Sequence, residues 1–389
     1  MKEVICMKVY TITCHDVYNH GASLQAYALM KYLTACGHNV EIIDYKPDYL
    51  SNHYKLSRIN HPHWENNKLK KVIYLAYKLP GRLRGLQRKR AFDTFTSTYM
   101  IRSRNRYCSN EELKKHLPPA DAYICGSDQI WNSLYENGKD PAFYLDFAPE
   151  DKIKVSYAAS FATDTISAQS IPFVQKHMKR LNHISVREKS GVEIVKSMNI
   201  SGAVNVVDPV LLLNEIEWNL VGNQKFTEDY ILVYDFDNSR LIKDAATELA
   251  KATGYKIYSI NPLHLKYADK QFTYAGPDVF VSIIRDAKFV ISNSFHAAVF
   301  SVIYKKNFVI VNREESINTR MRDFLQDLDL NDRLINKSYN LQSLMHPINY
   351  QRRQDILTDK ILFSKRFLCN MLLREKVEVS YAEEGVVCN

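Results

Sequence analysis

The 389-residue sequence lacks several features that assign a chain to a common class. It has no run of about 18 uncharged apolar residues, so no transmembrane helix is expected. It also has no Gly-X-Gly-X-X-Gly motif and no Gly-X4-Gly-Lys-Ser/Thr motif. These absences disfavour a bound dinucleotide cofactor and a phosphate-binding P-loop.

Cysteine is scarce and scattered. The seven cysteines are an odd number and include no Cys-X-X-Cys pair, so neither a disulfide framework nor a zinc site is expected. The N-terminal stretch contains Glu3 and Lys8 and no small-residue cleavage site. We therefore interpret it as a first strand rather than a signal peptide. Together these features predict a cytoplasmic protein with reduced thiols and no metal.

Acidic residues are scarce in one part of the chain. The formal net charge is +9, but residues 53–116 alone hold sixteen lysines and arginines against four acidic residues, an excess of twelve. The rest of the chain is therefore slightly acidic. Such a segment is either a solvated basic face or a surface that binds an anionic partner, such as nucleic acid or phospholipid.

Apolar residues are interleaved with these bases in KLKKVIYLAYKLPGRLRGLQRKRAFDTF (68–95). The mixture predicts a pair of interfacial helices broken at Pro80-Gly81. No helix-turn-helix, ribonucleoprotein or zinc-finger pattern accompanies it, so we expect no nucleic-acid partner. We expect residues 64–90 to dock on an anionic membrane surface, which would place the protein at the inner face of the membrane as a peripheral protein. A solvated basic helix face is the alternative.

Strand and helix patterns alternate along most of the chain, which predicts an α/β fold with parallel sheets. Two cores are expected at this length, and a second alternation starts near Asp229. We predict two doubly wound Rossmann-like domains facing across a cleft, as in GT-B glycosyltransferases. Their predicted bounds are residues 1–214, with a basic helical insert at 53–116, and residues 215–340, followed by a C-terminal helix and tail at 341–389.

The stretch DAYICGSDQIWN (121–132) indicates a buried strand that ends at a glycine. Ligands of open α/β sheets bind beyond the carboxyl ends of strands. Asp128 there offers an acid or a base, and Trp131 offers an apolar face on which a sugar ring packs, unless it lies in the core. The residues expected on this acceptor side are Gly126, Ser127, Gln129, Trp131 and Asn132.

The turn NHGASLQAYAL (19–29) joins the first strand to its helix. Its polar residues either contact a ligand or cap the helix. We add Asn19, Gly21 and Gln25 to the acceptor side.

The stretch ISNSFHAAVF (291–300) ends a strand and begins a helix. Ser292, Asn293 and Ser294 are good N-cap residues, and His296 follows in the first turn. A helix N-terminus favours an anion such as phosphate or carboxylate, and histidine adds a donor that titrates near neutral pH. A role in capping or packing is the alternative for His296.

The stretch HISVREKSG (183–191) places Arg187 after another strand. Arginine is a planar, bidentate partner for phosphate or carboxylate. A surface ion pair with Glu188 or Glu193 is the alternative, and this stretch alone does not decide between them.

In their order along the chain, these motifs resemble the polysaccharide pyruvyl transferase family. The resemblance spans residues 10–330 and is carried by NHGASLQAYAL, GSDQIWN, VSYAASF, ISVREKSG, VVDPVLLL and ISNSFHAAVFSVIYKKNFVIV. It implies a GT-B-like fold with phosphoenolpyruvate as co-substrate and no other cofactor. It also implies an acceptor sugar, often O4 and O6 of galactose, in a bacterial surface polysaccharide or its polyprenyl-diphosphate-linked precursor, on which pyruvate becomes a ketal.

The resemblance also assigns roles to three residues. Arg187 matches the family's arginine before an acid, and His296 matches the histidine of the second-domain motif. Both would bind the donor, and His296 would protonate the enol carbon so that a sugar hydroxyl attacks its neighbour. Asp128 matches the acidic residue after the glycine and is the candidate base. The expected catalytic residues are therefore Asp128, Arg187 and His296.

The chain departs from the family pattern at this second motif. Many members carry Ser-Arg-Leu-His-Gly, and this chain has Asn-Ser-Phe-His-Ala at 293–297. Ser294 with the helix N-terminus, or Arg320 or Arg322, is expected to supply the phosphate contact of the missing arginine. The donor residues expected are Ser292, Asn293, Ser294, Phe295 and Arg320.

A glycosyltransferase of the same fold with a nucleotide-sugar donor is the main alternative. The sequence shows no acidic-aromatic signature that we can assign to a uridine-binding pocket. The two hypotheses differ in the product released, which is phosphate in one and a nucleoside diphosphate in the other.

Overall fold

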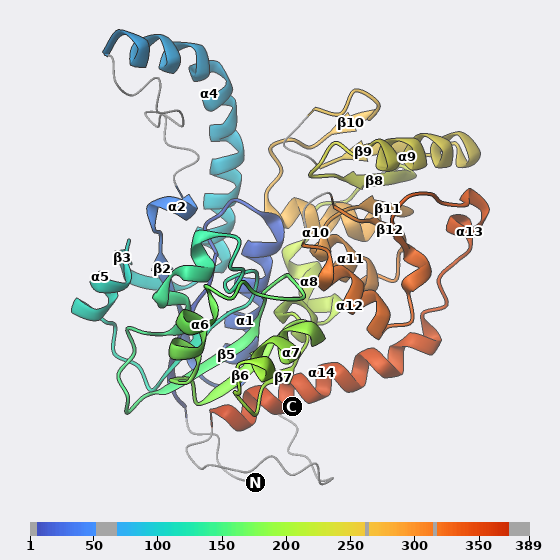
Figure 1. The fold of residues 1–389 in the computed structure, drawn as a ribbon. Coiled ribbons are helices and arrows are strands. Elements are labelled where there is room, and N and C mark those ends of the chain that lie inside the picture. Colours follow the sequence, from blue (N-terminus) through green and yellow to red (C-terminus); the bar gives the residue numbers. More distant parts are fainter. Residues whose placement is uncertain (1–5, 52–67, 261–263, 314–316, 373–389) are drawn as a thin grey trace.

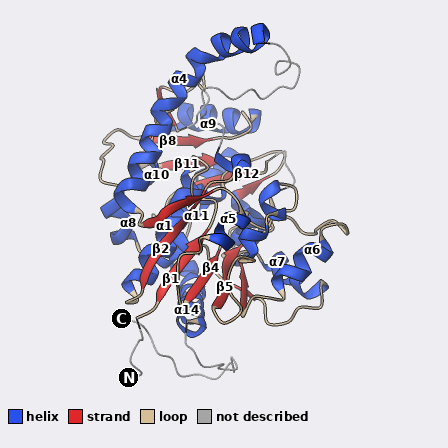
Figure 2. Ribbon diagram, turned by 90° about the vertical axis from the view of Figure 1, so that its left-hand side faces the viewer, coloured by secondary structure: helices blue, strands red, loops and turns tan. Residues whose placement is uncertain are grey.

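Two parallel sheets flanked by helices make up the protein, a computed structural model that describes residues 6–51, 68–260, 264–313 and 317–372. The first sheet has the strand order β3-β2-β1-β4-β5-β6-β7, and the second has β10-β9-β8-β11-β12-β13. Figures 1 and 2 show the strands of both sheets lying between layers of helices. In each sheet the order reverses beside the first strand, as in doubly wound nucleotide-binding folds. The predicted pair of Rossmann-like sheets is confirmed.

The first sheet is built from residues 8–205. Its strands are β1 (Lys8–Ile12), β2 (Asn39–Tyr45), β3 (Arg102–Tyr107), β4 (Ala122–Cys125), β5 (Ile153–Ala159), β6 (His183–Val186) and β7 (Val204–Asn205). Its helices are α1 (His20–Ala35), α2 (Asp48–Ser51), α4 (Lys68–Tyr99), α5 (Asn110–Lys115), α6 (Ile171–Met178) and α7 (Lys189–Ser197), with 3-10 turns η2 (Glu136–Lys139), η3 (Pro141–Tyr144) and η4 (Pro209–Leu212). All four residues of β4 are buried, because helices cover both faces of a parallel sheet.

The second sheet is built from residues 230–335. Its strands are β8 (Tyr230–Tyr234), β9 (Lys256–Ser259), β10 (Lys270–Gln271), β11 (Phe289–Ser292), β12 (Asn307–Val311) and β13 (Leu334–Ile335). Its helices are α8 (Glu215–Val221), α9 (Arg240–Thr253), α10 (Pro277–Asp286), α11 (Phe295–Ile303), α12 (Thr319–Asp327), α13 (Leu341–Met345) and α14 (Gln351–Met371), with the 3-10 turn η5 (Asn331–Arg333). Local signals explain α9, which has Ser239 as its N-cap and Gly254, at φ 75°, as its C-cap.

The two halves share one apolar core. Trp218 of α8 packs between Tyr27 of α1 and Phe300 of α11, at ring-centroid distances of 5.8 and 4.9 Å. Helix α14 runs past both halves in Figure 1 and returns to the first, where the Ser364 hydroxyl accepts a hydrogen bond from the Val207 amide at 2.9 Å. Buried aromatic contacts of this kind fix the position of one sheet relative to the other.

The basic segment differs from its prediction in two ways. One helix, α4, runs through Pro80 and Gly81, where a break between two helices was predicted. Proline removes a single helical hydrogen bond, so it bends a helix without necessarily ending it. Figure 1 shows that α4 bends along its length. The predicted tail beyond Leu372 and the segment 52–67 lie outside the described residues.

The segment is also not wholly helical, because its second part forms the edge strand β3. Arg102 and Arg106 of this strand pair with Asp44 of β2 at 3.3 and 3.4 Å, and Tyr107 is buried. Charged residues that alternate with buried ones are typical of an edge strand. Three of the sixteen basic residues of the segment, Arg102, Arg104 and Arg106, are therefore part of a sheet.

No helix among the described residues combines the length and the apolar character that a bilayer span requires. Within the same residues, no three His, Cys, Asp or Glu side chains gather in a way that would hold a metal ion.

Candidate active site

The strand ends of the two sheets bring the sequence-predicted catalytic residues together. Asp128 follows β4, Arg187 follows β6, and His296 lies in the first turn of α11 after β11. Arg187 is ion-paired with Asp208, which follows β7, and Nε2 of His296 lies 3.5 Å from the same carboxylate. The three predicted residues therefore meet at the junction of the two sheets, although they are far apart in the sequence.

Asp208 is the centre of this cluster. Its Oδ2 accepts a hydrogen bond from Nη1 of Arg187 at 2.8 Å and from the Ser127 hydroxyl at 3.3 Å, and lies 3.5 Å from Nε2 of His296. Its Oδ1 caps η4 by accepting from the Val210 amide at 3.1 Å. Asp208 thus links the loop after β4, the arginine after β6 and the histidine of the second half.

Charge in this cluster is stabilised by opposite charge rather than by water. Burial alone would raise the pKa of Asp208, but His296 and Arg187 hold that pKa below its usual range. Burial opposes the charge of Arg187, and Glu188 and Asp208 nevertheless raise its pKa. Both groups are therefore charged at neutral pH.

Glu188 lies on the other side of the Arg187 guanidinium. Its Oε1 accepts from Nε of Arg187 at 3.1 Å and from the Ser160 hydroxyl at 2.5 Å. Burial raises the pKa of Glu188, although Arg187 and Ser160 favour its charged form. The Arg187 side chain also lies over the Phe295 ring at 4.4 Å, which fixes the guanidinium plane.

Arg320 of α12 is a second buried guanidinium in this cluster. Its Nη1 lies 3.7 Å from Asp128, and its side chain lies over the same Phe295 ring at 6.0 Å. The Gln129 amide oxygen, turned toward α12, accepts from both terminal nitrogens at 2.9 and 3.2 Å. Burial, with the nearby Arg187, lowers the pKa of Arg320 to about 10, so it remains a cation at neutral pH.

Arg322 occupies a different place, although the sequence offered it as an equal alternative. It pairs with Asp164 at 2.7 Å and with Asp323 at 2.9 Å, outside the cluster. Two residues along a helix are rotated by about 200°, so Arg320 and Arg322 face opposite sides of α12. Of these two arginines, Arg320 is therefore the one that lies in the cluster.

His296 lies against the first turn of α1. A Cβ atom added at Gly21 would lie 1.9 Å from Nδ1 of His296, so only glycine leaves room for the ring. Gly21 thus allows a close approach of the two halves. Gly21 was predicted on the acceptor side, and the structure places it against His296. The packing sets the direction in which the imidazole points.

Several polar atoms of the cluster are buried without a hydrogen-bond partner among the described residues. They are Nη2 of Arg187, Nε of Arg320, Nε2 of His296 and Oε2 of Glu188. Buried donors without partners cost free energy, on the order of 1–3 kcal/mol each, and are typical of sites that receive a ligand. Three of the four are donors on cationic or titratable groups, so the vacant hydrogen-bonding capacity favours an anion.

Other residues predicted on the acceptor side make hydrogen bonds within the protein itself. The Gln25 amide oxygen accepts from the Ser127 amide at 3.2 Å, and Asn19 caps α1 by accepting from the Ala22 amide. The Asn132 amide oxygen accepts from the Leu134 amide at 3.0 Å within its own turn. These contacts hold the loop that carries Asp128 in place.

Trp131 does not offer a face to a sugar. It is completely buried, its Nε1 donates to the Phe143 carbonyl at 3.0 Å, and its ring stacks on Tyr144 at 5.5 Å. The expectation of an exposed stacking surface was wrong. The indole is held in the core because both its apolar rings and its single polar atom find partners there.

The Gly126 backbone is left-handed at φ 125°, and a Cβ there would lie 2.1 Å from the Tyr157 carbonyl oxygen. Only glycine allows this approach between β4 and β5. Beyond it, Asp128 has a side chain that is 15% exposed, the most accessible carboxylate of those that pair with Arg187.

The loop between β11 and α11 is strongly cross-linked to β8. The Ser292 hydroxyl donates to the Tyr234 carbonyl at 2.5 Å, and the Asn293 amide donates to Asp235 and Asp237 at 2.9 and 3.2 Å. Ser294 is the N-cap of α11. These three predicted donor residues thus form and fix the helix N-terminus that carries Phe295 and His296.

Sequence reasoning missed three features of the site. Asp208 was quoted in VVDPVLLL without a role, although an acid that directly follows an apolar run in a series of such strands is the signal that marked Asp128. Glu188 was considered only as a surface partner. Asp235 and Asp237, which form an Asp-X-Asp pair, were also not among the predicted site residues, and Asp237 pairs with Arg313 at 3.0 Å.

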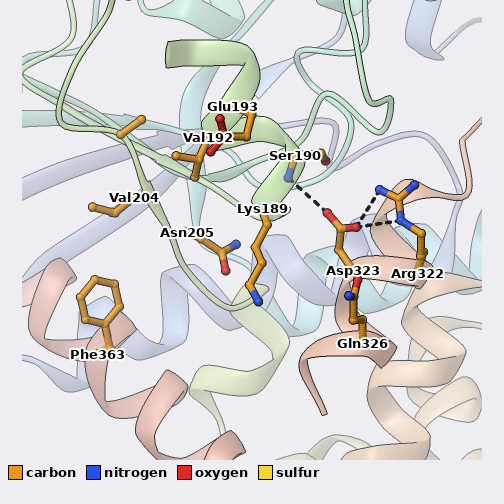
Figure 3. Close-up of a pocket in the computed structure, with 11 residues that line it drawn as sticks. Lys189, Ser190, Val192, Glu193, Val204, Asn205, Arg322, Asp323, Gln326 and Phe363 are labelled. Carbon is orange, nitrogen blue, oxygen red and sulfur yellow. Dashed lines mark hydrogen bonds and ion pairs between the residues drawn. The ribbon is translucent and has the colours of Figure 1, made fainter. Parts of the chain in front are cut away.

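A groove of about 550 Å³ lies beside the segment that follows Arg187 and the helix that carries Arg320. It is bordered by the start of α7, β7, α12 and α14, and Figure 3 shows Ser190 and Arg322 converging on Asp323 at its edge. The Ser190 amide donates to Asp323 at 3.2 Å, which ties α7 to α12. Residues that follow Arg187 and Arg320 in the sequence therefore line open space, and the two arginines face the buried cluster.

Solved structures of similar fold are distant from this chain. UDP-GlcNAc 2-epimerase from Neisseria meningitidis bound to UDP-GlcNAc is 11% identical, with a TM-score of 0.48 over 95% of this chain and 100% of that one. S. aureus MnaA bound to UDP is 12% identical, with a TM-score of 0.49 over 92% and 90%. An alpha-glucosyltransferase in complex with UDP and DNA is 7% identical, with a TM-score of 0.44 over 94% and 92%.

A search of the curated proteins found no relative. The model of one protein family, polysaccharide pyruvyl transferase, matches residues 19–315, which is most of the chain and includes the segments that hold Asp128, Arg187, Asp208 and His296. The chain belongs to the polysaccharide pyruvyl transferase family.

Proposed function

We propose that this protein transfers the pyruvate group of phosphoenolpyruvate to a sugar and releases phosphate. The observation that carries the proposal is the pair of buried guanidiniums, Arg187 and Arg320, each with a nitrogen that has no hydrogen-bond partner within the described residues. Phosphoenolpyruvate has both a phosphate and a carboxylate, and two arginines beside a helix N-terminus are suited to two anionic groups. The family to which the chain belongs supports the same reaction class.

We assign the phosphate contact of the missing family arginine to Arg320. Its side chain is buried over the Phe295 ring, its Nη1 lies 3.7 Å from Asp128, and its Nε has no hydrogen-bond partner in the described part of the chain. Arg187 is held rigidly by Glu188 and Asp208 and offers Nη2. A guanidinium that is already fixed loses little entropy when it binds an anion.

The chemistry proceeds by proton transfer to carbon, addition of one sugar oxygen, and displacement of phosphate by a second sugar oxygen. His296 donates its Nε2 proton to the methylene carbon of the enol, which becomes a methyl group, and the adjacent carbon becomes electrophilic. One sugar hydroxyl attacks that carbon and loses its proton to a base. The second hydroxyl then displaces phosphate, which leaves as the other proton is lost, and the product is a cyclic pyruvate ketal.

Two carboxylates have distinct roles in this scheme. Asp208, 3.5 Å from Nε2 of His296, is a positioning residue that orients the imidazole. Asp128 is the candidate base for the sugar hydroxyl, because it is the more accessible carboxylate, at 15% side-chain exposure against 0% for Asp208.

We propose galactose as the acceptor, with the ketal at O4 and O6, in a surface polysaccharide or its lipid-linked precursor. This part of the proposal rests on the family resemblance and on the loop at Asp128 and Gln129, which offers a carboxylate and an amide to sugar hydroxyls. A nucleotide-sugar glycosyltransferase is the alternative that the experiment must separate.

The experiment measures phosphate release from phosphoenolpyruvate with galactose-terminated lipid-linked acceptors, and mass spectrometry identifies the product. Wild type should give acceptor-dependent release, and Arg187→Ala, His296→Ala and Arg320→Gln should each lower kcat/KM by roughly a hundredfold or more. Arg322→Gln is the matched control, because it removes an arginine from the outer side of the same helix, and it should keep near-normal activity. Turnover of a nucleotide sugar without phosphoenolpyruvate use would overturn the proposal.

A further inference from the structure

Helix α4 has an anchored part and an exposed part. In the anchored part, Phe92 and Phe95 are buried, and Arg88 donates to the carbonyls of Tyr18 and Thr273 at 3.2 and 3.4 Å. Figures 1 and 2 show that the other part of the helix projects away from both sheets. The contacts of Arg88 join both halves, so the projecting part is held in a defined direction relative to the active site.

The projecting part exposes apolar side chains. Val72, Leu79 and Leu83 are 63%, 42% and 49% exposed, and Ile73 and Tyr77 are 53% and 78% exposed. These are five of the fourteen exposed large hydrophobic residues among the described residues, gathered in one short stretch of helix. Soluble proteins scatter such residues singly, and a cluster marks an interaction surface.

The spacing of these residues places them in a row. Val72, Leu79 and Leu83 are separated by seven and four residues, so they lie on one face of the helix. Lys71, Lys78 and Arg82 each precede one of them in the sequence, and therefore form a second row about 100° around the helix. We call these two rows together the α4 face.

The charge of this part of the helix has one sign. Residues 68–92 include nine lysines and arginines and no acidic residue. A second copy of the same helix would bring like charges together, which disfavours self-association through this face. Nucleic acid would satisfy the basic row and leave the apolar row in water. An anionic phospholipid surface satisfies both rows at once, because its headgroups are negative and its acyl chains are apolar.

We propose that the α4 face docks this protein on an anionic phospholipid surface. The apolar row enters the boundary between headgroups and acyl chains, and the basic row contacts lipid phosphates. This inference rests on the helix itself and does not depend on the reaction assigned to the active site.

The test is co-sedimentation with vesicles of phosphatidylglycerol and phosphatidylcholine in equal parts, against vesicles of phosphatidylcholine alone. Binding should need the anionic lipid and weaken as salt is added. The triple variant Lys71→Gln/Lys78→Gln/Arg82→Gln should bind roughly a hundredfold more weakly, since each basic residue near the surface contributes about 1 kcal/mol. The triple variant Val72→Gln/Leu79→Gln/Leu83→Gln should lose at least about tenfold.

The matched control is Ile216→Gln/Leu220→Gln on α8, which removes exposed apolar residues, 74% and 75% exposed, at another surface. It should bind vesicles like wild type, and circular dichroism should show that all variants are folded. Equal binding of wild type and both α4 variants would overturn the proposal. So would a dimer in light scattering that the apolar variant abolishes, or salt-sensitive binding of RNA or DNA in place of vesicles.

Discussion

Positive charge is concentrated in two regions of this protein, and the two regions hold it in opposite ways. In the active-site cluster, the Arg187 side chain is 2% exposed and is matched by Glu188 and Asp208 at 3.1 and 2.8 Å. In the projecting part of α4, the bases have no acidic residue among residues 68–92. A buried ion loses several kcal/mol of hydration and needs a partner within the fold. An exposed one keeps its water and is available to an external partner.

The largest expected effect on stability comes from removing the buried charge of Arg187. Arg187→Met should lower the free energy of unfolding by about 3–5 kcal/mol, because it leaves the charges of Glu188 and Asp208 without their cation. Urea denaturation followed by circular dichroism measures the loss. The double variant Arg187→Met/Glu188→Gln should recover part of it, since one uncompensated charge is removed as well. A loss below about 1 kcal/mol for the single variant would mean that the cluster is not coupled as its geometry indicates.

A smaller effect is expected from crowding His296. Gly21→Ala puts a methyl group where the imidazole lies, so the ring must shift and kcat/KM for pyruvyl transfer should fall roughly a hundredfold. Gly81→Ala on α4 is the matched control, because a Cβ there meets nothing within 4 Å. It should leave activity unchanged and stabilise the helix by up to about 1 kcal/mol. Full activity of Gly21→Ala would show that the position of His296 is not critical.

His20 provides a pH-dependent test of the junction between the halves. It packs on Phe280 at a centroid distance of 4.8 Å and bonds to the Tyr234 hydroxyl at 3.2 Å. Burial, with the nearby Arg88, lowers its pKa well below the ordinary 6.5. As pH falls below about 6.5, the unfolded chain binds a proton that the folded chain does not, so the folded state loses stability, by up to about 1.4 kcal/mol per pH unit.

The measurement for His20 is the melting temperature between pH 5 and pH 8. Wild type should lose stability toward pH 5 more steeply than His20→Gln, which keeps a polar side chain and does not titrate. Because other buried histidines contribute to both proteins equally, the difference in slope reports His20. Parallel curves would show that His20 is protonated in the folded protein.

The smallest effect on stability is expected from removing the exposed charges of α4. Lys71→Gln/Lys78→Gln should change the free energy of unfolding by no more than about 0.5 kcal/mol, because exposed charges contribute little to stability. Urea denaturation beside Arg187→Met makes the contrast direct. A large loss would mean that these lysines are part of the fold rather than of an external surface.

Much of the fold and three catalytic candidates followed from local signals in the sequence. Short apolar runs predicted the central strands, and polar residues at their ends predicted where Asp128, Arg187 and His296 lie. The errors fell where local signals conflict with tertiary packing. Pro80-Gly81 predicted a break that α4 does not have, and Trp131 after a glycine turn predicted an exposed ring that Tyr144 and Phe143 bury.

The sequence by itself determined the two parallel sheets, the helix caps and the placement of functional residues at strand ends, because each depends on residues that are neighbours in the chain. Only the tertiary structure decided that Asp208 joins Arg187 to His296, and that Arg320 rather than Arg322 enters the cluster. These pairs are separated by long stretches of chain, and their contact depends on how the two halves pack around Gly21 and Trp218. Packing of that kind arises from shape and burial summed over both sheets, and no local spacing encodes it.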